Sequence, residues 1–105
     1  MTNEHNSSSD GPVLENSVAA LAEARQRLAE VPAEIVVANH AMGLFELAAI
    51  HLSTDPPNLV GSSLAIDALA CLVDGLADRL GENSEVLADA LANIRMAFVE
   101  VTNRS

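Results

Sequence analysis

Apolar residues recur along this chain at the three- and four-residue spacing of amphipathic α-helices. Turn-forming and polar residues interrupt that spacing three times, which divides the chain into predicted helices at about 13–30, 33–53, 62–80 and 85–101. Ala and Leu dominate the apolar residues while Val and Ile are fewer, and this balance favours helices over sheets. Short connections make consecutive helices antiparallel neighbours, so we predict an all-α fold, a small up-and-down bundle of three to four helices.

Both ends of the chain are polar. Residues 1–11 are rich in Ser and Asn and have nothing to bury, so we predict a disordered tail there, with Asp10 as the cap of the first helix. Pro32 ends that helix, because the residue before a proline is pushed out of the α region. Between that first tail and a short C-terminal tail at 102–105, residues 12–101 are predicted to form a single helical domain.

Two loops separate the later helices. The connection at 54–61 contains two prolines, and Ser62 or Ser63 is predicted to cap the third helix after it. Gly81 is predicted to end the third helix, because glycine accepts the left-handed conformation that follows many helices.

The helix predicted over 33–53 carries apolar residues on two faces, although a helix at the edge of a monomeric bundle needs one. Its main face is predicted to lie in the core and contains Val37, Ala38, Ala41, Leu44, Phe45, Ala48, Ala49 and Leu52. Its second strip contains Val36, Gly43, Leu47 and Ile50.

The helix predicted over 62–80 is also apolar on more than one side. Its core face contains Ala65, Leu69, Leu72, Val73, Leu76 and Leu80. A second flank of mostly small residues contains Leu64, Ala68, Cys71 and Gly75. The helix predicted over 85–101 has the cleanest single face, formed by Leu87, Ala90, Leu91, Ile94, Ala97, Phe98 and Val101.

Three helices of this length cannot cover both second faces in a monomer. We therefore predict a homodimer that pairs the second strip of the 33–53 helix with the second flank of the 62–80 helix. Gly43 and Gly75 interrupt good helix formers on these faces, and close contact with a packing neighbour is the simplest explanation for them.

Charge narrows the range of partners. Fifteen Asp and Glu against five Arg give a net charge of −10, which repels phosphate backbones and anionic lipid surfaces. We therefore predict no direct contact with nucleic acid or membrane, while a basic protein fits as a partner. The N-terminal residues lack the basic and apolar regions of a secretory signal, and the single Cys71 excludes a disulfide scaffold, so a soluble, cytoplasmic protein is expected.

The second half of the chain resembles a small bacterial family known as domain of unknown function 1844. The resemblance spans about residues 31–101 and rests on the runs AIDAL with Leu72 and, in the last helix, IRMAFV after Leu91. It implies a small helical domain and supplies no catalytic residue. Genes of this family lie near translation genes in some bacteria, which implies at most a link to translation through protein contacts. The first predicted helix lies outside the resemblance and is interpreted as an accessory element.

Few side chains are arranged for chemistry. His40 and His51 are placed on one helix face, but about 16 Å apart, so one metal ion cannot bridge them. With Glu46 they are weak candidates for a ligand or metal site completed by another subunit. No recognised nucleophile, phosphate-loop or metal motif occurs in the sequence, so no catalytic residue, metal or cofactor is predicted.

A stripe of carboxylates marks the polar side of the 62–80 helix. Asp67, Asp74 and Asp78 form this stripe, which we interpret as a solvated face or as a docking surface for a basic partner. Asp67 is also placed to pair with Arg95 of the last helix. The sequence thus favours a non-enzymatic protein interaction module. The alternatives are a ligand- or metal-binding homo-oligomer and an accessory factor of translation.

Overall fold

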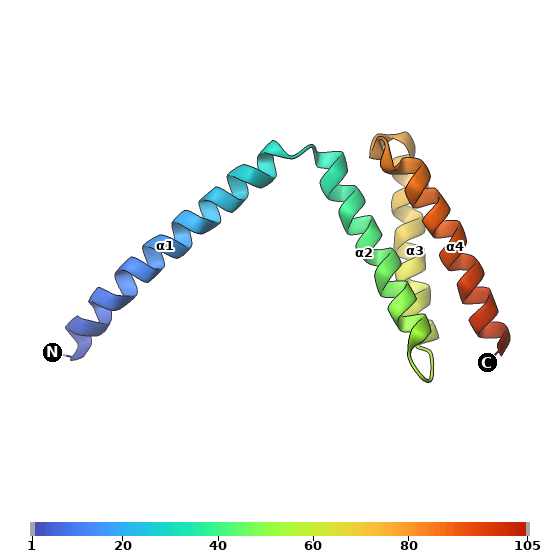
Figure 1. The fold of residues 1–105 in the computed structure, drawn as a ribbon, viewed down its shortest axis with the longest axis horizontal. Helices are drawn as coiled ribbons and strands as arrows, with labels where there is room; N and C mark the ends of the chain where they lie inside the picture. The colour runs from blue at the N-terminus through green and yellow to red at the C-terminus, as the bar shows by residue number, and fades with distance from the viewer. Residues whose placement is uncertain (1, 105) are drawn as a thin grey trace. The chain divides into compact units, whose positions relative to one another are not determined.

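The computed structural model describes the backbone of residues 2–104 and the side chains of residues 15–104. Within this range the chain is helical almost throughout and contains no strand, which confirms the predicted all-α class (Figure 1). The elements are α1 (Thr2–Glu30), α2 (Ala33–Ser53), α3 (Leu59–Leu76), the short 3₁₀ helix η1 (Ala77–Leu80) and α4 (Asn83–Arg104).

The chain divides into two compact units, Met1–Pro32 and Ala33–Ser105, where the sequence predicted a single domain over 12–101. The first unit consists of α1, whose described side chains are all exposed. Val18, Leu21 and Leu28 are 64%, 52% and 57% exposed, so the apolar line of this helix is not buried.

The start of α1 differs from the sequence prediction. The structure begins the helix at Thr2, whereas the sequence placed a disordered tail over 1–11 and a helix start near 13. Helical hydrogen bonds join backbone groups four residues apart, so a helix extends without any side chain to bury. The side chains of residues 1–14, including the predicted cap Asp10, lie outside the described part of the chain.

The second unit is a bundle in which α2, α3 and α4 pack against one another (Figure 1). Alanines with no exposed surface lie at the centre of α2, at Ala41 and Ala48, and Leu69 of α3 is equally buried. The three predicted core faces are confirmed. The buried apolar residues are Ala38, Ala41, Ala48, Leu52, Ala65, Ile66, Leu69, Ala70, Leu80, Leu87, Leu91 and Ile94.

The third helix begins three residues before its predicted start. Asn58, and not Ser62 or Ser63, is its cap, and the Asn58 side-chain oxygen accepts a 2.9 Å hydrogen bond from the Gly61 N–H. Ser62 is fully buried, and its hydroxyl donates a 3.2 Å hydrogen bond to the carbonyl oxygen of Ala48. A serine that seemed suited to a cap therefore connects α3 to α2 inside the core.

The third helix also ends early, at Leu76 and not at Leu80. Ala77 has a φ of 47°, a left-handed value that stops the α-helix, and the chain continues as η1. This short helix places Leu80 in the core at 1% exposure. Gly81 follows with a φ of 67° and ends η1, not the third helix as predicted, and its N–H donates to the carbonyl of Asp78.

The last helix is longer than predicted at both ends. It starts at Asn83 instead of 85 and continues to Arg104, through most of the predicted tail at 102–105. The hydroxyl of Thr102 lies 3.0 Å from the carbonyl oxygen of Phe98 and 2.8 Å from that of Val99. Thr102 is half-buried, so packing of its side chain accompanies the extension of the helix beyond Val101.

Leu69 tests the assignment of the bundle core. Leu69→Ala is expected to lower the free energy of unfolding by about 2–5 kcal/mol, because it leaves a cavity in a closely packed core. Val60 is 84% exposed on the same helix, so Val60→Ala is expected to change the free energy of unfolding by less than about 0.5 kcal/mol. Urea unfolding followed by circular dichroism measures both, and equal effects of the two substitutions would contradict the placement of the core.

Candidate functional site

Contacts at the two sides of α3 show which side faces each neighbouring helix. The Asn58 N–H donates a 2.8 Å hydrogen bond to the carbonyl of His51, and the His51 ring lies 3.0 Å from the position a Cβ at Gly61 would take. The Gly61 side of α3 therefore faces α2. On the other side, Asp67 of α3 and Arg95 of α4 line one hollow, so the Asp67 side faces α4.

Most of the predicted interface residues lie outside the buried core faces of α2 and α3. Ala68 and Gly75 follow Gly61 at seven-residue steps, so they continue the line of α3 that meets α2 at Gly61. On α2, Leu47 lies one turn before His51, whose ring lies beside Gly61. We call this surface the α2–α3 face. It contains Val36, Gly43, Leu47, Ile50, Leu64, Ala68, Cys71 and Gly75.

Most of the α2–α3 face is open to solvent in this chain. Leu47, Ile50 and Leu64 are 42%, 59% and 72% exposed. Gly43 and Cys71 are exposed as well. Leucine and isoleucine at such exposure leave apolar surface in water that burial against a partner would remove.

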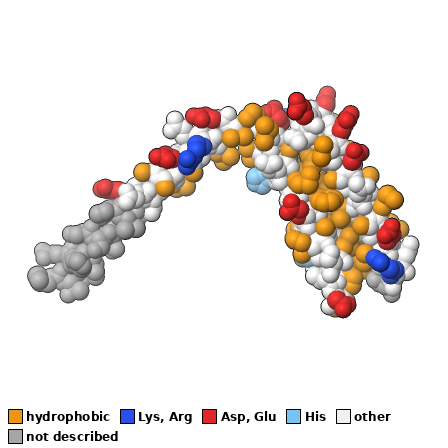
Figure 2. Space-filling view, in the orientation of Figure 1, with side chains coloured by type: hydrophobic (Ala, Val, Ile, Leu, Met, Phe, Trp, Pro, Cys, Tyr) orange, Lys and Arg blue, Asp and Glu red, His pale blue; other side chains and the backbone are white. Residues whose placement is uncertain are grey.

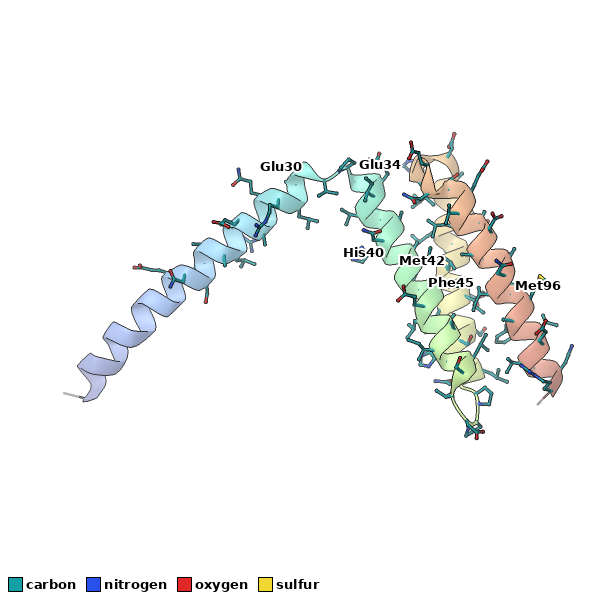
Figure 3. All side chains as sticks on the ribbon, viewed as in Figure 1. Glu30, Glu34, His40, Met42, Phe45 and Met96 are labelled. Atoms are coloured by element: carbon teal, nitrogen blue, oxygen red, sulfur yellow. The ribbon has the colours of Figure 1, made fainter. Side chains whose placement is uncertain are left out.

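Carboxylates are absent from the α2–α3 face as defined. Asp67 lines the hollow between α3 and α4, and Asp74 follows it at a seven-residue step on the same line of α3. On α2, Glu46 lies one turn after Met42, which packs against the core beside Phe45 on the other side of the helix (Figure 3). Glu46 lies one turn before Ile50 and Asp67 one turn before Cys71, so carboxylates border this face at its edges without belonging to it.

Gly43 and Gly75 are not points of close contact inside this chain. A Cβ atom built at either position would meet nothing within 4 Å in the described structure. The prediction that these glycines admit a close neighbour is therefore wrong for the packing of α2, α3 and α4 against each other. Each glycine weakens its helix by up to about 1 kcal/mol relative to alanine, with no compensating contact in the protomer.

The predicted ligand candidates do not converge. His40 extends from α2 on the side away from α4, and its Nδ1 lies 2.9 Å from the carbonyl oxygen of Val36 (Figure 3). His51 is half-buried beside Gly61, more than two turns further along the helix. Glu46 lies on the other side of α2 from both histidines. In the described part of the chain, no three His, Cys, Asp or Glu side chains come together as a metal site.

A hollow of about 320 Å³ opens between α3 and α4, and we call it the α3–α4 groove. Asp67 and Arg95 both line it, as their predicted proximity requires, but no ion pair joins them among the described residues. The sequence placed Phe98 in the core and did not single out Val99. The full lining is Ser63, Ile66, Asp67, Arg95, Phe98 and Val99.

The predicted acidic stripe is shorter than expected. Asp67 and Asp74 are exposed on one line of α3. Asp78 lies in η1, beyond the break at Ala77, so it does not continue that helical line. Acidic side chains also border the hydrophobic band on the side of the bundle that Figure 2 presents.

Two segments are long and apolar enough to cross a membrane by length and composition alone. These are Ala33–Ser53 and Leu59–Leu80. Core helices of water-soluble proteins meet the same criterion, so the finding does not assign a location.

Substitution of Gly43 tests whether the protomer itself needs a glycine there. Gly43→Ala is expected to raise the free energy of unfolding of the monomer by about 0.5–1 kcal/mol, since the methyl group meets open space. Gly61→Ala is the matched control. Its Cβ would lie 2.7 Å from the side chain of Asn58, so we expect it to destabilise the bundle by about 1 kcal/mol through the cap. Denaturant unfolding in dilute solution measures both, and a destabilising Gly43→Ala there would contradict the open environment.

Comparison with known proteins gives no relative: no protein-family model, curated protein or solved structure matches the chain. The resemblance to domain of unknown function 1844 therefore stays a prediction from residues 31–101.

Proposed function

We propose that the protein is a non-enzymatic protein interaction module that forms a homodimer through the α2–α3 face. One observation carries the proposal: in a chain with a net charge of −10, this face combines exposed Leu47, Ile50 and Leu64 with no carboxylate. The apolar side chains supply a driving force for burial, and the missing charges remove the main obstacle to self-association.

Charge is the reason for choosing a second copy as the partner. In a twofold dimer the same surface is used twice, so every carboxylate on it would approach the like charges of its copy. An acidic chain can therefore pair with itself most easily through a face without Asp or Glu. A basic protein would find no opposite charge on this face and would be attracted to other parts of the surface.

The dimensions of the face suit a pair of helices packing against a second pair. On α2 the strip runs from Val36 to Ile50, which corresponds to about 21 Å of helix. Gly43 lies at the middle of this strip, and its bare backbone lets another helix approach closely. Such an approach in the dimer would give a role to a glycine that has no close contact in the protomer.

The charges on the two apolar helices support a water-soluble, cytoplasmic protein. Asp67 lies near the middle of the segment Leu59–Leu80, where a membrane span would place it at the bilayer centre. A carboxylate there costs about 2.5–3.5 kcal/mol, and α2 adds Glu34 and Glu46.

Cell fractionation measures this location. After cell lysis and ultracentrifugation without detergent, the chain is expected in the supernatant. Recovery in the membrane pellet that resists high salt and alkaline carbonate would contradict a soluble location. Recovery in the pellet that salt removes would instead indicate attachment through a partner.

The proposed dimer predicts a specific effect of charge on the α2–α3 face. The wild-type chain is expected to have the mass of a dimer at micromolar concentration, and Leu64→Glu is expected to give a monomer, because it places like charges opposite each other. Val86→Glu adds the same charge at a valine that is 54% exposed on α4, so it should leave the dimer intact. Light scattering coupled to size-exclusion chromatography measures the mass, and circular dichroism confirms that each variant is folded. A wild-type monomer at tens of micromolar would refute the proposal.

Gly43→Ala gives an independent measure of the same interface. The methyl group stabilises the isolated helix, but it occupies space that a closely packed second copy would need. We therefore expect a more stable monomer and a weaker dimer, with a dissociation constant raised about tenfold in sedimentation equilibrium. An unchanged dissociation constant would place the contact elsewhere.

A further inference from the structure

We infer that the α3–α4 groove binds a basic, amphipathic helical segment of a partner protein. This surface is separate from the α2–α3 face. The inference rests on the proposed function in one respect, that the chain is an interaction module, and it names the partner of the second surface.

The floor of the α3–α4 groove is apolar. Ile66 is 6% exposed at its base, Phe98 is half-buried, and Val99 is 54% exposed at its edge. Phe98 is one of two aromatic side chains in the whole sequence. The volume of about 320 Å³ lies at the lower end of ligand pockets, about 300–1,000 Å³, and suits the anchoring side chains of a partner.

The surface beside the groove continues around α4 towards its outer side. A second hollow of about 340 Å³ is lined by Arg95, Met96, Val99 and Glu100, so it shares Arg95 and Val99 with the first. Met96 is 64% exposed on the outer side of α4 (Figure 3). Methionine adapts its shape to different partners, and a groove between two helices with apolar residues at its floor and edge fits the apolar side chains that one face of a partner helix presents.

The charges at the rim favour a basic partner. Asp67 and Glu100 border the two hollows, and Asp74 continues the line of Asp67 along α3, against the single cation Arg95. None of these four side chains forms an ion pair in the described part of the chain. Lys or Arg beside the apolar anchors of a partner would find carboxylates here, whereas a second copy of this chain would bring more negative charge.

A synthetic helix of defined composition tests the groove. The probe is a fluorescein-labelled, 14-residue amphipathic peptide of Leu and Lys, and the comparison is the same peptide with Glu in place of Lys. Fluorescence anisotropy with the full chain is expected to show binding of the Leu/Lys peptide that weakens as salt rises, and no binding of the Leu/Glu peptide. Equal binding of both peptides, or of neither, would overturn the inference.

Variants separate the groove from general attraction to an acidic protein. Asp67→Asn removes a rim charge, and Val99→Ser removes an exposed apolar edge, so each is expected to weaken binding by about three- to tenfold. Glu46→Gln removes the same charge from α2, away from the groove, and should leave affinity within about twofold. Equal weakening by Asp67→Asn and Glu46→Gln would show attraction without a site and would refute the inference.

The position of the bound peptide is measured by amide NMR. Shift changes are expected at Ser63, Asp67, Arg95 and Val99, and changes confined to Gly43 and the rest of the α2–α3 face would refute the groove. The mass of the wild-type chain, measured beside its peptide binding, makes the two proposals distinguishable. If the wild-type chain stays monomeric but binds the peptide in the groove, the homodimer fails and the groove stands. If it dimerises and leaves the groove unoccupied, the groove fails alone.

Discussion

The close packing of α2 against α3 is the interaction on which the rest of the bundle depends. It uses small side chains at the centre: Ala41 and Ala48 of α2 have no exposed surface, and Ala65 of α3 has 2%. The buried hydroxyl of Ser62 adds a hydrogen bond to the carbonyl of Ala48, which fixes the two helices lengthwise. Small residues let the helix axes approach closely.

Charge is the reason why we propose different partners for the two main surfaces. The chain has one cation for every three carboxylates, so an apolar surface without Asp or Glu is unusual on it. On the α2–α3 face the missing carboxylates favour a second copy, and at the α3–α4 groove the carboxylates around Ile66 and Val99 favour a basic helix. Because the two surfaces lie on different sides of α3, a dimer formed through the first would leave the second open on each protomer. The two proposals are therefore compatible within one assembly.

Several sequence predictions failed at residues whose side chains suit more than one structural role. Ser62 has the side chain of a helix cap, but burial made its hydroxyl a link to α2, and Asn58 three positions earlier satisfied the helix end. Gly43 suggested close packing, yet its surroundings in the protomer are open. Asp67 and Arg95 did come to one groove as predicted, without an ion pair between them. The residue type alone is compatible with either role in each case. The position of the neighbouring helix decides which role the side chain takes.

The sequence alone determined the helical class, the core faces of α2, α3 and α4, and the separation of apolar strips from acidic stripes, because helical periodicity places residues on faces without knowledge of neighbours. It also marked Gly81 as a position of positive φ, although this glycine ends η1 and the third helix ends earlier, at Leu76. The tertiary structure decided how those faces meet. It showed that the second strips of α2 and α3 stay largely exposed in the protomer, that Leu80 of η1 is buried in the core, and that α1 forms a unit of its own with exposed apolar side chains. These features depend on the rotation and register of packed helices, which are set by contacts between residues far apart in the chain.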